Sequence, residues 1–261
     1  MIDIGVNLTN KRFDKDLEVV INNAKQAGIT RLIVTGTNIT ESKQALTLAK
    51  AYPDLIYSTA GIHPHDASTL NEETLKQLRD LVLQPQVKAI GECGLDFNRN
   101  FSTPAEQEKA FIQQLELAVE YQLPVFMHER DANRRFIELL TPYIKQLPNA
   151  VLHCFTGNQE ELERCLALDL HIGITGWICD ERRGQHLLEL VKMIPDDRLM
   201  IETDSPYLLP RSMRPKPKSN RNEPKYLPYI AQTIANARQQ DLQDFLKITE
   251  KTSTAFFNLT Q

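Results

Sequence analysis

Four apolar runs of this sequence end in side chains that can bind a divalent metal. Glu92 follows the run Val87–Ile90, His128 and His153 stand in VFMHER and VLHCF, and Asp204 ends LMIETD. If these runs are parallel strands, their carboxyl ends lie on one face and the four groups converge. Two imidazoles and two carboxylates suit a divalent metal site that leaves positions open for water and substrate. Taken singly, each has a structural explanation, because a strand-end histidine is often only hydrogen-bonded and an aspartate there often caps a helix.

Three further groups are predicted on the same face. His63 and His65, in GIHPH, follow the apolar run Ile56–Ile62 and are candidates for binding phosphate or metal, although a histidine pair in a loop is often merely solvated. Arg130, two residues after His128, is a candidate anion clamp or a partner of a neighbouring acid. We therefore expect these three residues to contact substrate.

The segment Pro206–Pro228 is basic, although the whole chain has a net charge of -4. It holds six cations (Arg211, Arg214, Lys216, Lys218, Arg221 and Lys225) and a single anion, Glu223. A cationic, proline-rich loop after the last strand suits a polyanion such as a nucleic-acid backbone, with Arg182 and Arg183 extending the patch. An exposed loop can also be basic by chance.

Strands and helices alternate along the chain. Apolar runs predict strands at Met1–Val6, Arg31–Thr35, Ile56–Ile62, Val87–Ile90, Pro124–Met127, Val151–Leu152, His171–Thr175 and Leu199–Ile201. Amphipathic patterns between them predict helices, among them one capped by Thr103, Pro104 and Glu106, one by Asn158 with Glu161, and one near Gly184–Met193. This count favours a (β/α)8 TIM barrel, as does the length of 261 residues. A doubly wound open sheet is the alternative, since periodicity does not show closure.

Composition gives broader limits. No linker or repeat divides the sequence, so we expect a single domain over residues 1–261. The four cysteines form no C-x-x-C pair, which favours reduced thiols. No apolar run reaches the roughly 18 to 20 residues of a membrane span, and the start MIDIGVNL lacks the pattern of a signal peptide. We expect a cytoplasmic protein that is a monomer and has no membrane partner.

The motifs GIHPH, GECGLD, FMHERDA, LHCFTG, ETDSPYL and RNEP, in this order, resemble those of the TatD-type deoxyribonucleases of the metal-dependent hydrolase superfamily. The resemblance runs from Asp3 to the C-terminal helices. It implies a (β/α)8 fold and magnesium-dependent hydrolysis of phosphodiesters, by a 3′-to-5′ exonuclease of single-stranded DNA and of RNA that acts in DNA repair or degradation. It also implies that Glu92, His128, His153 and Asp204 are the metal ligands.

One departure concerns the first strand. Many relatives have H-x-H there, whereas this chain has Gly5 and Asn7. Glycine has no ligand side chain and asparagine offers a neutral oxygen, so we expect one metal to be held less tightly, or a second to bind only with substrate. His and carboxylate ligands accept Mn²⁺ or Zn²⁺ as well as Mg²⁺.

These residues lead to a mechanistic hypothesis and to alternatives. Glu92 anchors the metal, Asp204 binds metal or the attacking water and takes its proton, and His63, His65 and Arg130 contact phosphate. The same barrel supports an amidase, deaminase or lactonase, or a deacylase of misacylated tRNA. A binding protein for nucleic acid or protein that has lost catalysis is the alternative outside enzymes.

Overall fold

The computed structural model describes residues 1–259, and within them eight strands form one sheet in the order β1 to β8. The strands are β1 Ile2–Val6, β2 Arg31–Val34, β3 Ile56–Ala60, β4 Val87–Asp96, β5 Val125–Arg130, β6 Ala150–Leu152, β7 His171–Ile174 and β8 Leu199–Ile201. A doubly wound sheet would reverse its strand order midway. The sequential order and the parallel ladders are instead those of a (β/α)8 barrel, as predicted.

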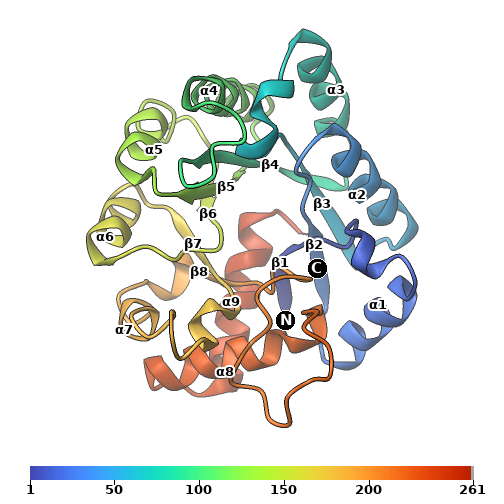
Figure 1. The fold of residues 1–261 in the computed structure, drawn as a ribbon, viewed down its shortest axis with the longest axis vertical. Coiled ribbons are helices and arrows are strands. Elements are labelled where there is room, and N and C mark those ends of the chain that lie inside the picture. The colour runs from blue at the N-terminus through green and yellow to red at the C-terminus, as the bar shows by residue number, and fades with distance from the viewer. Residues whose placement is uncertain (260–261) are drawn as a thin grey trace. The chain divides into compact units, whose positions relative to one another are not determined.

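A helix follows each strand, and one more ends the described chain (Figure 1). The helices are α1 Leu17–Gln26, α2 Ile39–Ala51, α3 Glu72–Val82, α4 Pro104–Tyr121, α5 Asn133–Leu140, α6 Gln159–Ala167, α7 Leu187–Leu190, α8 Leu227–Arg238 and α9 Leu242–Phe256. Short 3-10 helices are η1 Lys11–Phe13, η2 Pro64–Thr69, η3 Gly176–Cys179, η4 Asp196–Arg198 and η5 Pro224–Tyr226. None of the helices within residues 1–259 has the length and apolar character to cross a membrane.

The predicted caps are present. Thr103 and Glu106 bond reciprocally at the start of α4, where Pro104 is the first helical residue. Asn158 and Glu161 do the same at α6. The helix predicted near Gly184–Met193 is much shorter than expected, because Gly184 belongs to the preceding turn: its N–H donates to Asp180, and a Cβ on it would collide with a backbone oxygen.

The chain falls into two compact units. The first unit contains Met1–Ile33, Cys154–Leu162 and the residues from His171 onward, and it includes β1, β7 and β8; a parallel bridge joins Val6 to Ser205 after β8. The second unit contains Val34–His153 and Glu163–Leu170, and it includes β3 to β6. That residues 1–261 act as a single domain stays a prediction.

The second unit is organised by β4, the longest strand among the described residues. Gly91 and Gly94 flank Glu92 with φ angles of 140° and 136°. A Cβ at either position would lie about 2 Å from a backbone oxygen of β5, that of Phe126 or His128. Glycine is therefore required for β4 to approach β5 so closely, and this approach brings Glu92 beside His128.

Candidate metal and catalytic site

Glu92, which is buried, is the centre of a cluster of side chains in the second unit, and two of its neighbours, His63 and His128, are partly exposed. Its side chain leaves β4, and its Oε1 lies 2.7 Å from His153 Nε2, 3.2 Å from His128 Nδ1 and 3.4 Å from His63 Nε2. His153 follows β6, His63 follows β3, and His128 lies in β5 two residues before its end. Of the four strand-end groups predicted to converge, Glu92, His128 and His153 thus lie together. His63, predicted as a substrate contact, thus lies on the same carboxylate oxygen as two predicted metal ligands.

The imidazoles keep Glu92 charged. Burial alone would raise the pKa of Glu92, but attraction to His153 and His63 and hydrogen bonds from His128 and His153 hold it well below its usual range. Burial would also lower the pKa of His128, yet hydrogen bonds to Asp96 and Glu92 raise it. The pKa of His63 is lowered, because burial outweighs the attraction of Glu92. The cluster is therefore a buried anion among ring nitrogens.

This donor set fits a divalent metal. One ligand atom each of His63, Glu92 and His128 lies within 4.8 Å of the other two, and His153 bonds to the same carboxylate oxygen. A carboxylate with several imidazoles is a common environment for Zn²⁺, Mn²⁺ and related ions. The Nδ1 of His63 accepts the N–H of His65, so a neutral His63 carries its proton on Nε2. His63 is thus better suited to donate a hydrogen bond to an anion than to ligate metal.

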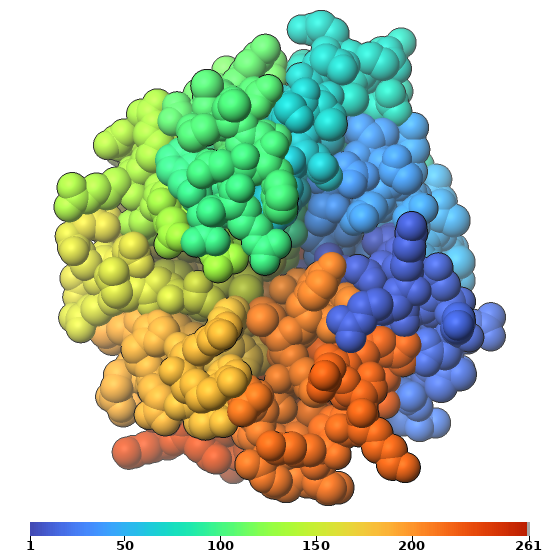
Figure 2. Space-filling model, viewed as in Figure 1, coloured from blue at the N-terminus to red at the C-terminus, as the bar shows by residue number. Residues whose placement is uncertain are grey.

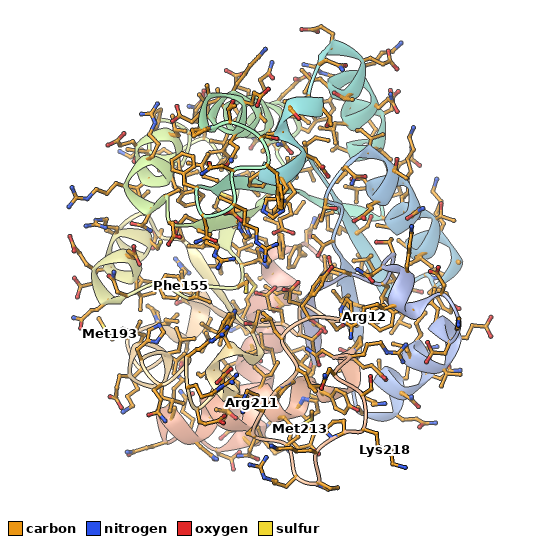
Figure 3. The ribbon with its side chains drawn as sticks, viewed as in Figure 1. Arg12, Phe155, Met193, Arg211, Met213 and Lys218 are labelled. Atoms are coloured by element: carbon orange, nitrogen blue, oxygen red, sulfur yellow. The ribbon has the colours of Figure 1, made fainter. Side chains whose placement is uncertain are left out.

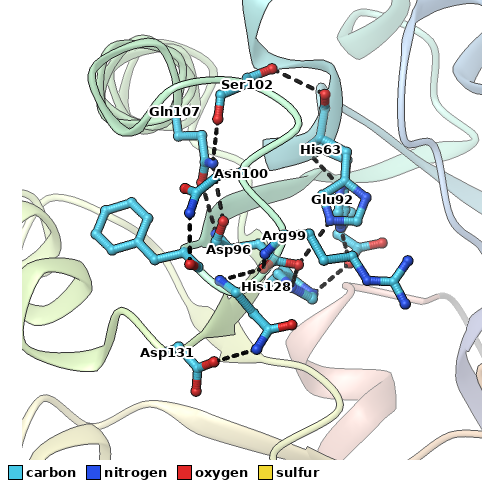
Figure 4. A network of polar contacts seen from close by, with 12 residues as sticks. His63, Glu92, Asp96, Arg99, Asn100, Ser102, Gln107, His128 and Asp131 are labelled. Atoms are coloured by element: carbon cyan, nitrogen blue, oxygen red, sulfur yellow. Dashed lines mark hydrogen bonds and ion pairs between the residues drawn. The ribbon is translucent and has the colours of Figure 1, made fainter.

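Asp96 supports the cluster, although no role was predicted for it from the sequence. This residue is only 1% exposed, and its Oδ2 lies 2.8 Å from His65 Nε2 and 3.5 Å from His128 Nε2 (Figure 4). Burial would raise its pKa, but hydrogen bonds from His128, His65 and the backbone of Arg99 lower it. The spacing of the two acids could have indicated this role, because residues four apart on one strand share a face and Asp96 comes four residues after Glu92. His65 is therefore held against Asp96, whereas Arg130 is exposed at the end of β5.

Asp204 lies in the first unit, just after β8. Its N–H donates to the carbonyl of Gly5, and its Oδ1 accepts a hydrogen bond of 2.9 Å from Nδ2 of Asn7. The same Asn7 amide donates to the carbonyl of Ser205. Asn7, one of the two first-strand positions singled out from the sequence, thus binds the Asp204 carboxylate through its amide N–H. That Asp204 joins Glu92 on one metal stays a prediction.

A second buried acid lies behind Asp204. Asp3 is 0% exposed; its Oδ1 accepts a hydrogen bond of 2.9 Å from the N–H of Thr203, and its Oδ2 lies 2.5 Å from the Thr203 hydroxyl. Burial raises the pKa of Asp3 to about 8, more than these bonds lower it. Asp3 is therefore neutral at pH 7 and fixes the segment that carries Asp204.

The basic loop is less cationic than its composition suggests. Arg211 pairs with Glu181 at 2.8 Å, Arg221 with Asp16 at 2.7 Å, and Lys225 with Glu223 at 2.7 Å. Among residues 1–259, Lys216 and Lys218 make no ion pair, and Figure 3 shows Lys218 at the outer edge of the loop. Figure 2 shows the loop, in orange, at the surface. The exposed charge available to a polyanion is thus concentrated in the loop's middle.

Comparison with protein families gives one match over nearly the whole chain. A family described as TatD related DNase matches residues 2–258. Proteins named 3′-5′ ssDNA/RNA exonuclease TatD are 58% identical in Pectobacterium parmentieri, over 99% of this chain and 100% of the relative, and 54% identical in Escherichia fergusonii, over 100% of both.

Solved structures confirm the fold. A TatD family hydrolase from Entamoeba histolytica has a TM-score of 0.89 at 28% identity, with 100% of this chain and 98% of that chain covered. YJJV, a TatD homolog from Escherichia coli, has a TM-score of 0.89 at 26% identity and the same coverage. The (β/α)8 fold class predicted from the sequence is therefore confirmed.

Proposed function

Because the chain belongs to the TatD related DNase family, we propose that it is a metal-dependent exonuclease that hydrolyses phosphodiester bonds of single-stranded DNA and RNA from the 3′ end. Relatives at 54–58% identity are named as 3′-5′ exonucleases of single-stranded DNA and RNA, which supports this substrate and direction. The observation that carries the chemistry is the convergence of three imidazoles on Oε1 of Glu92. A role in DNA repair or degradation is part of the proposal.

The chain's own residues would divide the work as follows. His128, His153 and Glu92 hold the metal, for which we propose Mg²⁺, and His63 donates a hydrogen bond to the substrate phosphate. A bound divalent metal would neutralise charge on the phosphate oxygens and activate the attacking water. Asp204, oriented by Asn7, is the proposed fourth ligand and acceptor of the water proton. His65 and Arg130 are proposed to contact neighbouring phosphates, in a protein that acts as a cytoplasmic monomer.

The test is digestion of single-stranded DNA and RNA labelled at either end, with Mg²⁺, Mn²⁺, Zn²⁺ or a chelator. We expect shortening from the 3′ end that requires metal and is strongest with Mg²⁺. The variant Asp204→Asn should lower the rate by about 10²–10⁴-fold, the usual contribution of a positioned acid or base. Asp14→Asn is the matched control, because Asp14 is an exposed acid of the same unit. Cleavage unaffected by chelator, or by Asp204→Asn, would contradict the proposal.

A further inference from the structure

The loop that joins β4 to α4 presents an aromatic ring to solvent. Phe101 is 66% exposed, although a phenylalanine in a folded protein is usually buried. Its ring lies edge-to-face with His65, with centroids 4.8 Å apart and planes at 82°. An apolar ring left open to water beside a polar cluster is a site where another flat group can stack.

The loop is held rigidly at both ends. Oδ1 of Asp96 accepts the N–H groups of Asn98 and Arg99, each at 3.0 Å. At the other end, the Ser102 hydroxyl donates to the carbonyl of His65, and Gln107 Nε2 donates to the carbonyls of Asp96 and Ser102 (Figure 4). A loop fixed in this way loses little conformational freedom when a ligand binds.

Phe101 is linked to the Glu92 cluster by a short series of contacts. The ring touches His65, whose Nε2 lies 2.8 Å from Oδ2 of Asp96. The same Oδ2 lies 3.5 Å from His128 Nε2, and His128 lies 3.2 Å from Glu92. A group stacked on Phe101 would therefore bind beside the metal cluster of the second unit.

The same loop offers a positive charge. Arg99 is exposed and forms no ion pair within residues 1–259. In Figure 4 its side chain extends from the loop on the side of the view where His63 and Glu92 are drawn. A flat apolar ring and a free guanidinium, two residues apart, match the two parts of a nucleotide: a base and a phosphate.

We propose that Phe101 is a stacking platform for an unpaired nucleobase next to the scissile bond, and that Arg99 binds the neighbouring phosphate. The proposal rests on the nuclease function proposed above and names the substrate group recognised by this loop. A base within a duplex is stacked on its neighbours and paired, so its face is not available to Phe101. The platform therefore favours single strands.

The experiment compares Phe101→Ala, Phe101→Trp and Phe101→Leu on a single-stranded oligonucleotide. We expect Phe101→Ala to raise KM about tenfold with little change in kcat, because stacking on one base commonly contributes this much affinity. Phe101→Trp should behave like the wild type, and Phe101→Leu should lie closer to Ala. Leu83→Ala is the matched control: Leu83 is 65% exposed but precedes the start of β4, whereas Phe101 follows its end.

Oligonucleotides with one abasic residue at each of the last three 3′ positions show whether the partner is a base. At one position, the wild type and Phe101→Ala should have equal KM values, because the stacking partner is missing for both. An equal difference between the two proteins on every abasic substrate would overturn the proposal. So would a fall in kcat at unchanged KM, because the ring would then only support His65.

Binding without cleavage separates this proposal from the proposed function. Fluorescence anisotropy in the presence of chelator gives Kd for the same proteins and oligonucleotides. Absence of 3′ digestion together with weaker binding by Phe101→Ala would contradict the exonuclease function and leave the stacking site supported. Digestion from the 3′ end with equal Kd and KM for the wild type and Phe101→Ala would support the exonuclease function and contradict the stacking site.

Discussion

Two acidic side chains, Glu92 on β4 and Asp3 on β1, are buried to nearly the same degree, 7% and 0% exposed, yet their pKa values are shifted in opposite directions. The pKa of Glu92 is held well below its usual range, whereas burial raises that of Asp3 to about 8. Because both residues lie in apolar strands and are similarly buried, burial alone does not explain why their pKa values differ. The neighbours do, since Glu92 faces imidazoles and Asp3 faces a hydroxyl and backbone N–H groups.

This difference in charge suits Glu92 to bind a metal and Asp3 to hold the structure by hydrogen bonds. An ionised carboxylate among ring nitrogens can bind a cation together with those nitrogens. A neutral carboxylic acid is a poor ligand but a good hydrogen-bonding link. A protonated Asp3 can donate to the Thr203 hydroxyl, which lies 3.2 Å from that of Ser205. A buried acid in a strand therefore marks a functional site only when its partners can carry positive charge.

The largest effect should follow from removing the charge of Glu92. We expect Glu92→Gln to lower nuclease activity by roughly 10³-fold or more and to weaken metal binding, because an amide cannot serve as the central anion of the cluster. Activity with Mg²⁺ and the Kd for Mn²⁺ from calorimetry measure these effects. Asp3→Asn is the matched control, a buried acid replaced by its amide in the other unit. Similar losses in both variants would remove the distinction between the two acids.

The sequence predicted the fold and the residues around Glu92 well, for a physical reason. In a parallel sheet every strand ends on one edge, so a polar residue after an apolar run is placed by topology alone. Glu92, His128 and His153 are of this kind. Gly91 and Gly94 are visible as glycines, but their close approach to β5 depends on a partner strand more than thirty residues away.

Other features depend on side-chain partners that are distant in sequence. Composition makes the loop after β8 cationic, yet Arg211 and Arg221 are neutralised by Glu181 and Asp16. From the sequence, Asn7 offers a metal only a neutral oxygen, and the structure adds that its amide N–H donates to Asp204. The exposure of Phe101 could not be predicted from the sequence, because an apolar residue in a loop is buried as often as it is exposed. Hydrophobic periodicity predicts where strands and helices lie, whereas these contacts depend on which distant side chains the fold brings together.

An intermediate effect should follow from Asn7. In Asn7→Ala, Asp204 loses the amide N–H that orients its Oδ1, and we expect kcat/KM to fall about 10-fold to 100-fold, as for other residues that orient metal ligands. Steady-state kinetics with single-stranded DNA measure it. Asn10→Ala is the control, because Asn10 donates to Tyr207 rather than to Asp204. If the control lost as much activity as Asn7→Ala, the effect would come from the loop and not from Asp204.

The smallest effect on activity should follow from Asp3→Asn, whose amide can replace the protonated acid as a donor to Thr203. Stability should change with pH instead. The folded protein keeps the Asp3 proton up to about pH 8, whereas the unfolded chain loses it near 3.8. The folded state therefore binds more protons between these values, and the contribution of Asp3 to the free energy of unfolding falls as pH rises from about 4 to about 8. Melting temperatures from pH 5 to 8 should decline more steeply for the wild type than for Asp3→Asn, and parallel curves would show that Asp3 is already ionised in the folded protein.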